Sequence, residues 1–520
     1  MKNILGVFFG LLFFTTSYCQ ETYNHRLDFD RPVPTVMTSI VVNDSCYYVS
    51  GITIDSVAPF NTRILFAKMS LEGEVVWYKT MFDSFANYSA WKNTLMRTED
   101  NGFAIAGNYV DTLGAAIIFI KLDSIGDTLV TKKYFSPYSS IDDFIRLVDS
   151  RKTEDNGYLL LSNINSPTSY TDLYLIKIDS VGNVLWDRIY GGDGLSESGK
   201  SIELINDRIV IGAYSHNTNF ATNNFTSRTY VFGIDSVQNI GWEYATPENE
   251  FWGSANDILR TEDGGLLVAS WKGVEVPDNA YYSHLEWDNH LLKLDVNHNY
   301  EWGVSYQDSF ASGGDYFNKL ITPSDQSGYV TVGQIYKPKL AENTYDLFGV
   351  ISKISLAGDS LWTRYYHHVV SPFDQHDLYD VEETPDGGFI MVGQATDLLQ
   401  VAEQPLQRAW IVKVDQYGCL VPGCHLLSDV TEPGAALDIQ VNIYPNPTSN
   451  YLNIYFRHPA MKDKAVFDLL DASGKSVLQF ESGHGDITHM VDVSELAAGS
   501  YWLTCRVGQE VLSKEVVIVR

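Results

Sequence analysis

The densest cluster of residues that could catalyse a reaction or bind a ligand lies between positions 283 and 290. These positions read Ser-His-Leu-Glu-Trp-Asp-Asn-His. His284, Glu286, Asp288 and His290 supply imidazole and carboxylate groups of the kind that hold metals or transfer protons. Trp287 adds a flat ring on which a sugar could stack. We expect these five residues to bind a ligand. The alternative is a polar surface loop of an acidic protein that carries such residues by chance.

The sequence gives little support for any other catalytic, phosphate-binding or metal-binding site. His367, His368 and His376 form a second, sparser cluster. There is no nucleophile elbow, phosphate-binding glycine loop or paired-histidine metal motif. Because the chain has 65 Asp and Glu residues, pairs of carboxylates carry no information. We therefore predict no catalytic residue, no metal and no cofactor.

The overall charge restricts the partners. The formal net charge is −29 with a pI near 4.6, and nucleic acids and anionic membranes need basic surfaces. We expect neither as a partner. Aromatic residues make up 13% of the chain, including 32 Tyr, which suits a β-rich fold. We also expect a monomer.

The first 19 residues have the layout of a secretory signal peptide. Lys2 provides the positive end, residues 4–14 form an apolar run, and Ser17 and Cys19 are small residues at −3 and −1. The run is too short to span a membrane, and no later stretch is a better candidate. We expect cleavage before Gln20 and export of a protein that is not integral to the membrane.

The cysteines fit an exported protein. Cys419 and Cys424 flank a four-residue turn, and we expect them to form a disulfide, because exported proteins meet oxidising conditions. A metal site at this pair is the weaker alternative, since no matching second pair exists. Cys46 and Cys505 lie in apolar runs and are expected to be buried thiols.

The candidate residues sit within a repeat that organises most of the chain. Each copy has an apolar strand, a turn led by Asp and tipped by Gly, and a second strand carrying Trp. The first two copies of the repeat start 53 residues apart, and the last two start 60 residues apart. The copies start at Lys68, Lys121, Lys177, Gly233, Lys293, Lys353 and Lys413. A period of this kind indicates a repeat architecture.

A second signature precedes each copy, such as Thr-Glu-Asp-Asn-Gly at 98–102 and 153–157. Such turns between apolar runs are typical of β-hairpins. Each unit is therefore predicted to contain four antiparallel strands, and seven units predict an all-β, seven-bladed β-propeller. The connections between second and third strands vary most, with insertions at 273–289 and 336–345.

The repeated residues have structural explanations. The turn Asp can accept backbone N–H groups, whereas a calcium site would need more oxygen ligands. The lysines either pair with the acidic residues of the Thr-Glu-Asp turns or extend to the blade edge. The repeated Trp is expected to pack between blades, with its indole N–H bonded to a turn carbonyl. This hairpin resembles the tryptophan-docking repeats of quinoprotein-type propellers, a resemblance from which we infer packing and no quinone cofactor.

The last unit lacks a fourth strand, because residues 419–424 interrupt it. We expect residues 22–30 to close that blade, since open sheet edges would otherwise remain. The predicted domains are the signal peptide at 1–19, the propeller at 20–424, a linker at 425–440 and a C-terminal β-sandwich at 441–520.

The C-terminal segment carries a specific set of motifs. It begins with Tyr444, Pro445, Asn446 and Pro447, has an Asp-Ala-Ser-Gly-Lys turn at 471–475, and continues through Gly499 and Tyr501 to Lys514. In this order it resembles the type A C-terminal sorting domain of the Bacteroidetes type IX secretion system. The resemblance implies recognition by the outer-membrane translocon and a secreted or surface-attached product. Tyr444 and Tyr501 either pack in the domain core or contact the receptor.

Three functions remain open at this point. The first is a secreted binding or adhesion module for a glycan or surface protein. The second is an extracellular hydrolase or lyase acting on polysaccharide or protein at a propeller mouth. The third is a surface scaffold with no discrete ligand. Propellers host all three, so the fold alone does not separate them.

Overall fold

The computed structural model describes residues 22–29, 33–138, 144–167, 170–191, 195–205, 208–217, 226–247, 253–277, 283–306, 315–339, 344–368, 374–397, 407–420, 440–444, 446–458, 465–471, 474–482, 485–507 and 510–519. Every regular element in these ranges is a β-strand, and no helix there is long and apolar enough to cross a membrane. The chain divides into two compact units, Met1–Leu426 and Leu427–Arg520. The signal-peptide prediction lies outside the described residues.

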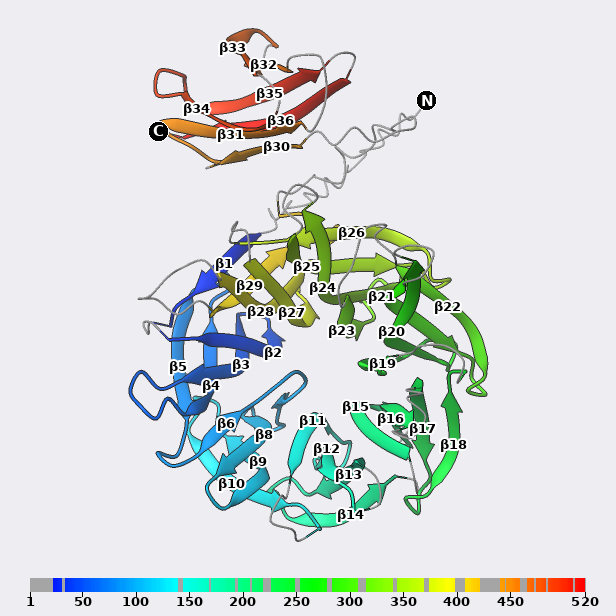
Figure 1. The fold of residues 1–520 in the computed structure, drawn as a ribbon. Helices are drawn as coiled ribbons and strands as arrows, with labels where there is room; N and C mark the ends of the chain where they lie inside the picture. Colours follow the sequence, from blue (N-terminus) through cyan, green and yellow to red (C-terminus); the bar gives the residue numbers. More distant parts are fainter. Residues whose placement is uncertain are drawn as a thin grey trace, which may run out of the picture. The chain divides into compact units, whose positions relative to one another are not determined.

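The described strands of the first unit form seven groups arranged in a ring (Figure 1). Group 1 contains β2 (Thr35–Asn43), β3 (Cys46–Ile54), β4 (Thr62–Met69) and β5 (Val75–Met81). Group 2 contains β6 (Asn87–Ser89), β7 (Leu95–Arg97), β8 (Phe103–Asp111), β9 (Gly114–Leu122) and β10 (Thr128–Phe135). Group 3 contains β11 (Ile145–Lys152), β12 (Tyr158–Asn165), β13 (Thr171–Ile178) and β14 (Val184–Tyr190).

The remaining groups repeat this pattern. Group 4 contains β15 (Leu195–Ile205), β16 (Arg208–Asn217), β17 (Thr226–Ile234) and β18 (Ile240–Ala245). Group 5 contains β19 (Asp257–Arg260), β20 (Leu266–Pro277), β21 (Ser283–Leu294) and β22 (Tyr300–Tyr306). Group 6 contains β23 (Tyr316–Ile321), β24 (Tyr329–Lys339), β25 (Thr344–Ile354) and β26 (Ser360–Tyr366). Group 7 contains β27 (Asp374–Glu383), β28 (Phe389–Asp397), β29 (Gln407–Val414) and β1 (Tyr23–Leu27).

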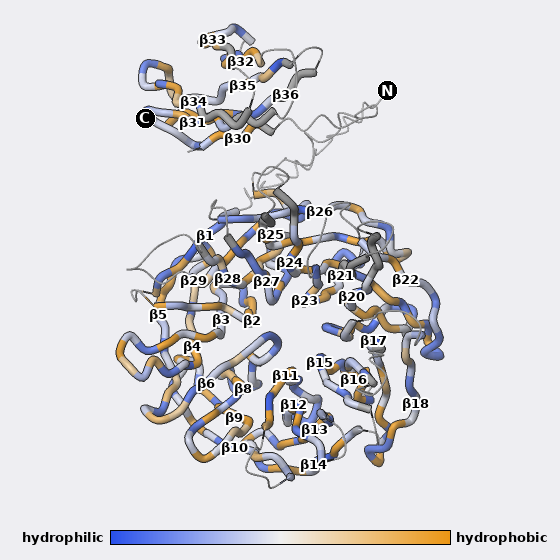
Figure 2. The backbone as a smooth tube through the Cα atoms, in the orientation of Figure 1, coloured by the Kyte–Doolittle hydropathy of each residue, from blue (hydrophilic) through white to orange (hydrophobic). Residues whose placement is uncertain are grey.

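Neighbouring strands within a group pair antiparallel, and the first strand of a group lies nearest the centre of the ring (Figure 1). Groups 6 and 7 are joined into one sheet by a single parallel pairing of Leu347 with Gln375. The predicted all-β, propeller-like fold class is confirmed. Figure 2 shows hydrophobic residues alternating with hydrophilic ones along the ring, and the buried apolar clusters combine strands of adjacent groups.

The N-terminal strand joins the last group. β1 pairs antiparallel with β29, from Tyr23 opposite Lys413 to Leu27 opposite Ala409. A second contact links the ends of the ring, since the buried Asp380 carboxylate of group 7 accepts bonds from the Ile40 amide of group 1 at 2.9 Å and from a neighbouring serine hydroxyl. The first contact completes group 7 with the N-terminal strand, and the second connects group 7 to group 1.

The turn between the third and fourth strands explains the repeated Asp. In group 3, one Asp179 carboxylate oxygen accepts the amides of Val181 at 3.0 Å and Asn183 at 2.8 Å, while Gly182 has a φ of 84°. The same pattern of two accepted amides occurs at four other turn residues, namely Asp123, Asp235, Asp295 and Asp415. The Asp acts as a local backbone acceptor, as the structural interpretation predicts.

Five of the six repeated lysines form ion pairs with the Asp of the Thr-Glu-Asp-type turns, which confirms the pairing hypothesis for these five, whereas Lys68 lies over the Tyr48 ring. In each case a largely buried ammonium meets a more exposed carboxylate. The five N–O distances are 2.6 to 3.0 Å, for Lys121–Asp100, Lys177–Asp155, Lys293–Asp263, Lys353–Asp325 and Lys413–Asp386. Hydrogen bonds from Thr98 and Lys121 hold the pKa of Asp100 at about 2, and a bond from Lys177 does the same for Asp155.

The repeated Trp packs on the turn of the next group. A Cβ on Gly358 would meet the ring of Trp302 at 2.9 Å, and Trp242 stacks on His298 with ring centroids 3.6 Å apart. Packing between groups is therefore as predicted. The predicted hydrogen bond from the indole is wrong for the described residues, because in groups that carry this Trp tyrosines such as Tyr306 and Tyr366 donate to the turn carbonyl instead.

The two predicted insertions are longer hairpins rather than loops. β20 pairs with β21 from Leu266 opposite Leu294 out to Pro277 opposite Ser283. β24 and β25 likewise pair as far as Lys339 opposite Thr344. The two arms of each insertion pair with each other, so their backbone N–H and C=O groups are satisfied. The strands of these two hairpins can therefore be longer than those of the other groups.

The second unit contains two sheets. One has the strands β30 (Gln440–Tyr444), β31 (Tyr451–His458) and β34 (Gly485–Asp492). The other has the strands β33 (Ser476–Ser482), β32 (Ala465–Leu470), β35 (Gly499–Val507) and β36 (Glu510–Ile518). Residues of both sheets, including Leu452 and Phe467, share one buried core. This is the predicted small sandwich.

Candidate ligand-binding site at the centre of the ring

The central site is built on a five-residue loop, Ala90–Thr94, which we call the central loop. It separates β6 from β7, and both strands pair with β8. The interruption lets these residues leave the sheet and reach toward the centre of the ring (Figure 1). Asn93 adopts a φ of 56°, a left-handed conformation that Asn tolerates better than most residues.

Hydrogen bonds hold the central loop to several groups. The Lys92 ammonium donates to the carbonyl oxygens of Asn256 and Asn318, the latter at 3.0 Å. The Asn93 side chain accepts a bond from Lys319 of group 6 at 2.6 Å, and its carbonyl accepts one from Ser150 of group 3 at 2.9 Å. The loop is therefore a fixed part of the ring centre.

Above this loop lies a cavity of about 440 Å³ lined from groups 2 to 7. Its lining includes aromatic rings, cations and amide side chains. The aromatic residues are Trp91, Trp271, Tyr316 and Tyr379. The cations are Lys92, Arg146 and Lys200, and the amides are Asn163, Asn256 and Asn318. No carboxylate occurs among the described lining residues. We call this cavity the central pocket.

The rings and cations of the central pocket support one another. The Arg146 guanidinium lies 5.8 Å from the Trp91 ring centroid, within cation–π range, and Trp91 packs edge-on against Tyr379 at 6.2 Å. Burial lowers the pKa of Lys92 to about 8, and burial together with Arg146 lowers the pKa of Lys200. Lys92 lines the pocket, while its ammonium also donates to two backbone carbonyls.

The nearby acidic residues are engaged elsewhere. Asp149 accepts the Ile202 amide at 2.7 Å and an Arg151 bond at 2.9 Å, and Asp257 accepts the Leu320 amide at 2.8 Å. These carboxylates connect the innermost strands of groups 3 and 4 and of groups 5 and 6. They do not line the central pocket, whose described side chains are cationic or neutral.

Asp377 sits behind the two pocket tyrosines. Its carboxylate receives bonds from Tyr316 at 3.5 Å, Tyr379 at 3.3 Å and Gln394 at 2.9 Å. Burial raises its pKa to about 6. Asp377 is 6% exposed, and its carboxylate accepts both tyrosine hydroxyls.

The described pocket side chains include no serine nucleophile with a base beside it. Its described lining has no His, Cys or carboxylate. Its hydroxyl residue, Ser254, donates to Asn256 at 2.5 Å and lies 3.3 Å from the Trp271 indole nitrogen, which donates to it. A serine nucleophile needs a neighbouring base, and these partners supply none.

The cluster predicted at 284–290 lies in β21 and not in a loop. The side chains of His284 and Glu286 lie outside the described residues. Asp288 and His290 are 4% and 5% exposed, and His290 is 2.9 Å from the Ser305 hydroxyl. Trp287 packs edge-on against Trp271 at 4.2 Å, so it supports a ring of the central pocket.

In the second histidine cluster, His376 has a structural environment, whereas His367 and His368 are exposed. His376 is fully buried, accepts the His368 amide at 3.0 Å and lies 3.1 Å from the Leu347 carbonyl. Burial lowers its pKa to about 3, so the ring is neutral. Among the described residues, no three His, Cys, Asp or Glu side chains are grouped to hold a metal.

Two of the three cysteine predictions can be placed. Cys46 and Cys505 are buried free thiols, as expected. Cys419 is buried at the end of group 7, while Cys424 lies outside the described residues. The Cys419–Cys424 disulfide stays a prediction.

The sorting motif has a structural explanation in the second unit. The Asn446 side chain accepts the Val517 amide at 2.7 Å and donates to the Glu515 carbonyl at 2.8 Å. The Thr448 amide donates to the Val517 carbonyl of the same edge strand, β36, and the Thr448 carbonyl accepts the amide of Val519, just after that strand. The motif thus covers the free edge of the final strand, which would otherwise be open for pairing.

The remaining motif residues differ in exposure. Tyr501 is 8% exposed and donates to the Ala497 carbonyl, whereas Tyr444 is 50% exposed. Of the two alternatives left open for these residues, Tyr501 belongs to the core and Tyr444 lies on the surface. Lys514 and Pro447 are exposed, and Gly499 has open space around its Cα. Pro445 lies outside the described residues.

The central pocket was missed in the sequence because its parts are far apart in the chain. One local signal existed. The second unit interrupts its first strand with Ala-Trp-Lys-Asn-Thr at 90–94, and Trp91 stands outside the repeated Trp position. Departures from a repeat are where ligand sites are expected.

Comparison with known proteins identifies the second unit. Residues 442–519 match the family described as the secretion system C-terminal sorting domain. This segment is a type IX sorting domain, and the protein is secreted or attached to the outer surface. No curated protein matches the chain in sequence.

Three of the similar solved structures are as follows. Drosophila semaphorin 2a is 9% identical, with 96% of this chain and 98% of that chain covered and a TM-score of 0.41. A Synechocystis apocarotenoid oxygenase mutant is 10% identical, with 65% and 73% covered and a TM-score of 0.38. A DUF4221 family member from Bacteroides vulgatus is 10% identical, with 60% and 93% covered and a TM-score of 0.35. At these scores the likenesses carry no argument about function.

Proposed function

We propose that this chain, whose residues 442–519 are a type IX sorting domain, is a surface or secreted binding protein whose seven strand groups are the blades of one closed propeller. Its ligand is an acidic saccharide held in the central pocket. One observation carries the proposal: four aromatic rings and three cations converge there without a carboxylate among the described lining residues.

The chemistry of the pocket matches a carboxylated sugar. Arg and Lys donors make charge-assisted bonds to carboxylates, and the amide side chains supply donors and acceptors for hydroxyl groups. The flat rings of Trp91 and Trp271 offer apolar faces. A cavity of about 440 Å³ suits a short oligosaccharide segment.

The acidity of the whole protein does not oppose this binding. Charges further away than about 8 Å are strongly screened at physiological ionic strength. Lys92, Arg146 and Lys200 line the pocket itself, whereas Asp149 and Asp257, which interact electrostatically with Lys92, lie outside its lining. The charges nearest a bound ligand would therefore be positive although the net charge is −29.

Binding is favoured over hydrolysis because the described pocket residues include neither a carboxylate pair nor a serine with a neighbouring base. A lyase could use Lys92 or a pocket tyrosine as its base, and the turnover assay below tests that alternative. A surface scaffold without ligand would have no need for a central loop whose Lys92 reaches two other strand groups. The experiment is a screen of the purified full chain against neutral and acidic oligosaccharides, with binding measured by calorimetry and turnover by release of reducing ends.

The expected result is binding of acidic but not neutral oligosaccharides. Arg146→Ala should lower the affinity about tenfold, since one charge-assisted bond contributes ~1.5 kcal/mol. Arg188→Ala is the matched control, because Arg188 is exposed on the outer strand β14. Equal affinity for neutral and acidic sugars, or turnover of a polysaccharide, would contradict the proposal.

Export is tested separately. Deletion of residues 441–520 should leave the protein in the periplasm, because the translocon would no longer have its recognition domain. Fractionation followed by detection of the propeller measures this. Arrival of the shortened chain at the cell surface would contradict the role given to the sorting domain.

A further inference from the structure

Tyrosines fill the space between neighbouring groups at four places in the ring. Each stands four residues after the repeated Trp position and donates its hydroxyl to the third–fourth-strand turn of the next group. The bonds are Tyr134 to the Gly182 carbonyl at 2.7 Å, Tyr190 to Gln238 at 3.1 Å, Tyr306 to Gly358 at 2.8 Å and Tyr366 to Gly418 at 2.6 Å. The fold thus has a repeated slot for a phenol ring.

Group 1 has Met81 where these groups have Tyr. Met81 stands four residues after Trp77, and the facing turn of group 2 presents Gly126. A neighbouring contact confirms the equivalence, because Lys79 pairs with Asp127 at 2.5 Å as Lys132 meets Asn183 in the next slot. Among the described residues, no donor bonds the Gly126 carbonyl.

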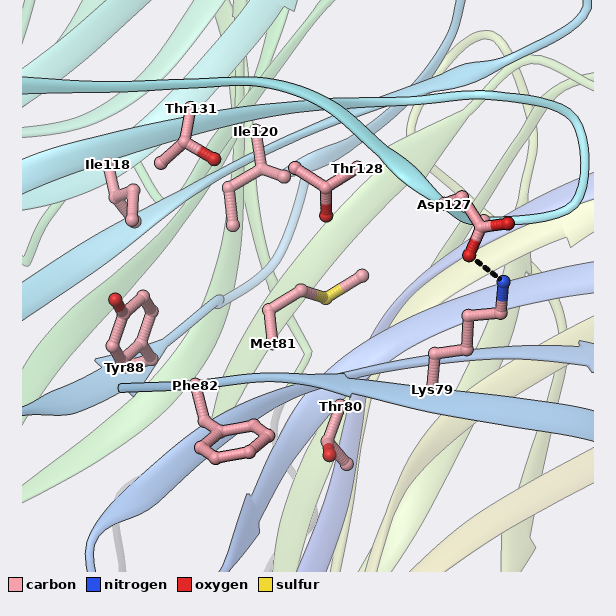
Figure 3. A pocket seen from close by; sticks show the side chains of 11 residues that line it. Lys79, Thr80, Met81, Phe82, Tyr88, Ile118, Ile120, Asp127, Thr128 and Thr131 are labelled. Carbon is pink, nitrogen blue, oxygen red and sulfur yellow. Dashed lines mark hydrogen bonds and ion pairs between the residues drawn. The ribbon is translucent and has the colours of Figure 1, made fainter. Parts of the chain in front are cut away.

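A cavity of about 480 Å³ occupies this position. Figure 3 shows Met81 extending from β5 toward Ile120 and Thr128 of group 2, with Tyr88 and Ile118 beside it. The ring-sized space is therefore apolar at its base. Gly126 also belongs to the lining.

The edge of the cavity is polar. Threonine hydroxyls stand on both sides, and the Lys79–Asp127 ion pair crosses one end (Figure 3). Both members of the pair are partly exposed, with side-chain exposures of 35% and 63%. A ligand can enter from solvent beside this pair without breaking the core.

We propose that this slot binds a p-hydroxyphenyl group. The ring lies on the side chains of Met81 and Ile120, and its hydroxyl donates to the Gly126 carbonyl, as the four tyrosines do in their own slots. Met81 is suited to line such a site, because its unbranched thioether adapts its shape to a ring. The group can come from a tyrosine side chain or from a small phenol.

The test uses the full chain and three probes: p-cresol, toluene and N-acetyltyrosinamide. Calorimetry or ligand-observed NMR should show one p-cresol per chain. Toluene should bind about fivefold more weakly, because it cannot make the hydrogen bond to Gly126. Tighter binding of N-acetyltyrosinamide than of p-cresol assigns the site to tyrosyl groups, and the reverse assigns it to small phenols.

Two matched variants locate the site. Met81→Tyr should supply the missing ring, abolish p-cresol binding and raise the melting temperature. Tyr134→Met should open an equivalent slot between groups 2 and 3 and raise the stoichiometry from one to two. Absence of p-cresol binding to the natural chain, or unchanged binding to folded Met81→Tyr, would overturn the proposal.

Discussion

Replacing either member of the Lys413–Asp386 ion pair should have very different effects on stability. Lys413 is 2% exposed, and its ammonium lies 3.0 Å from both Asp386 oxygens and 3.2 Å from the Val414 carbonyl. Asp386 is 30% exposed and keeps bonds from Thr384 and the Gly388 amide. The lysine thus depends on its partner far more than the carboxylate does.

Asp386→Ala leaves a buried ammonium without its counter-ion and should lower the free energy of unfolding by about 3 kcal/mol. That is roughly a 150-fold change in the folding equilibrium. Lys413→Met removes the buried charge, keeps an apolar side chain of similar length and leaves Asp386 with solvent and two donors. It should cost about 1 kcal/mol or less.

Urea denaturation followed by tryptophan fluorescence measures the difference. Of the eleven tryptophans, Trp502 alone lies in the sorting domain, so the signal reports the ring. Burial already lowers the pKa of Lys413, and loss of Asp386 should lower it further. The folded variant then binds fewer protons than the unfolded chain, so its stability should rise as the pH increases above 7.

The natural chain should show much less of this rise with pH. Equal destabilisation by the two substitutions would refute the reasoning from burial. A stability of Asp386→Ala that falls between pH 7 and pH 10, relative to the natural chain, would refute the reasoning from the lysine charge.

Three further changes test other parts of the structure. Asn446→Ala removes both side-chain bonds to β36 and should speed hydrogen exchange at the Val517 amide; unchanged exchange would contradict the edge-covering role of the motif. Asp155 and Asp263 have pKa values of about 2 in the folded chain, so the stability that they contribute should persist above about pH 4 and be lost as the pH falls toward 2. In a thermal melting series, a fall in stability between pH 7 and pH 5 as large as the fall between pH 4 and pH 2 would contradict this. Tyr366→Phe should cost about 1 kcal/mol, since it leaves the Gly418 carbonyl without its donor; an unchanged denaturation midpoint would contradict that estimate.

Local patterns in the sequence predicted most of the repeating scaffold. The Asp-led turns, the lysine ion pairs and the packing of Trp between groups each depend on residues of one hairpin and the one beside it. β1 was expected in the last group on the ground that the ring must close, and it pairs with β29. Because these features recur, a correct interpretation of one repeat applies to the other copies.

The central pocket could not be read in this way. Lys92 meets the Asn256 and Asn318 carbonyls, which are 164 and 226 residues away in the chain, and no local pattern brings them together. The strand pairing of residues 283–290 was also hidden, because alternating polar and apolar residues suit both an exposed loop and an extended hairpin. The sequence shows Met81, but only the structure shows that tyrosines fill the equivalent position in other groups.

A crystal structure of the full chain with an acidic oligosaccharide would show whether the central pocket binds an acidic saccharide. Ligand density is expected between Trp91 and Trp271, with a carboxylate within hydrogen-bond distance of Arg146 or Lys200. Density elsewhere on the ring with the central pocket empty, or no density under conditions where the oligosaccharide binds in solution, would contradict it.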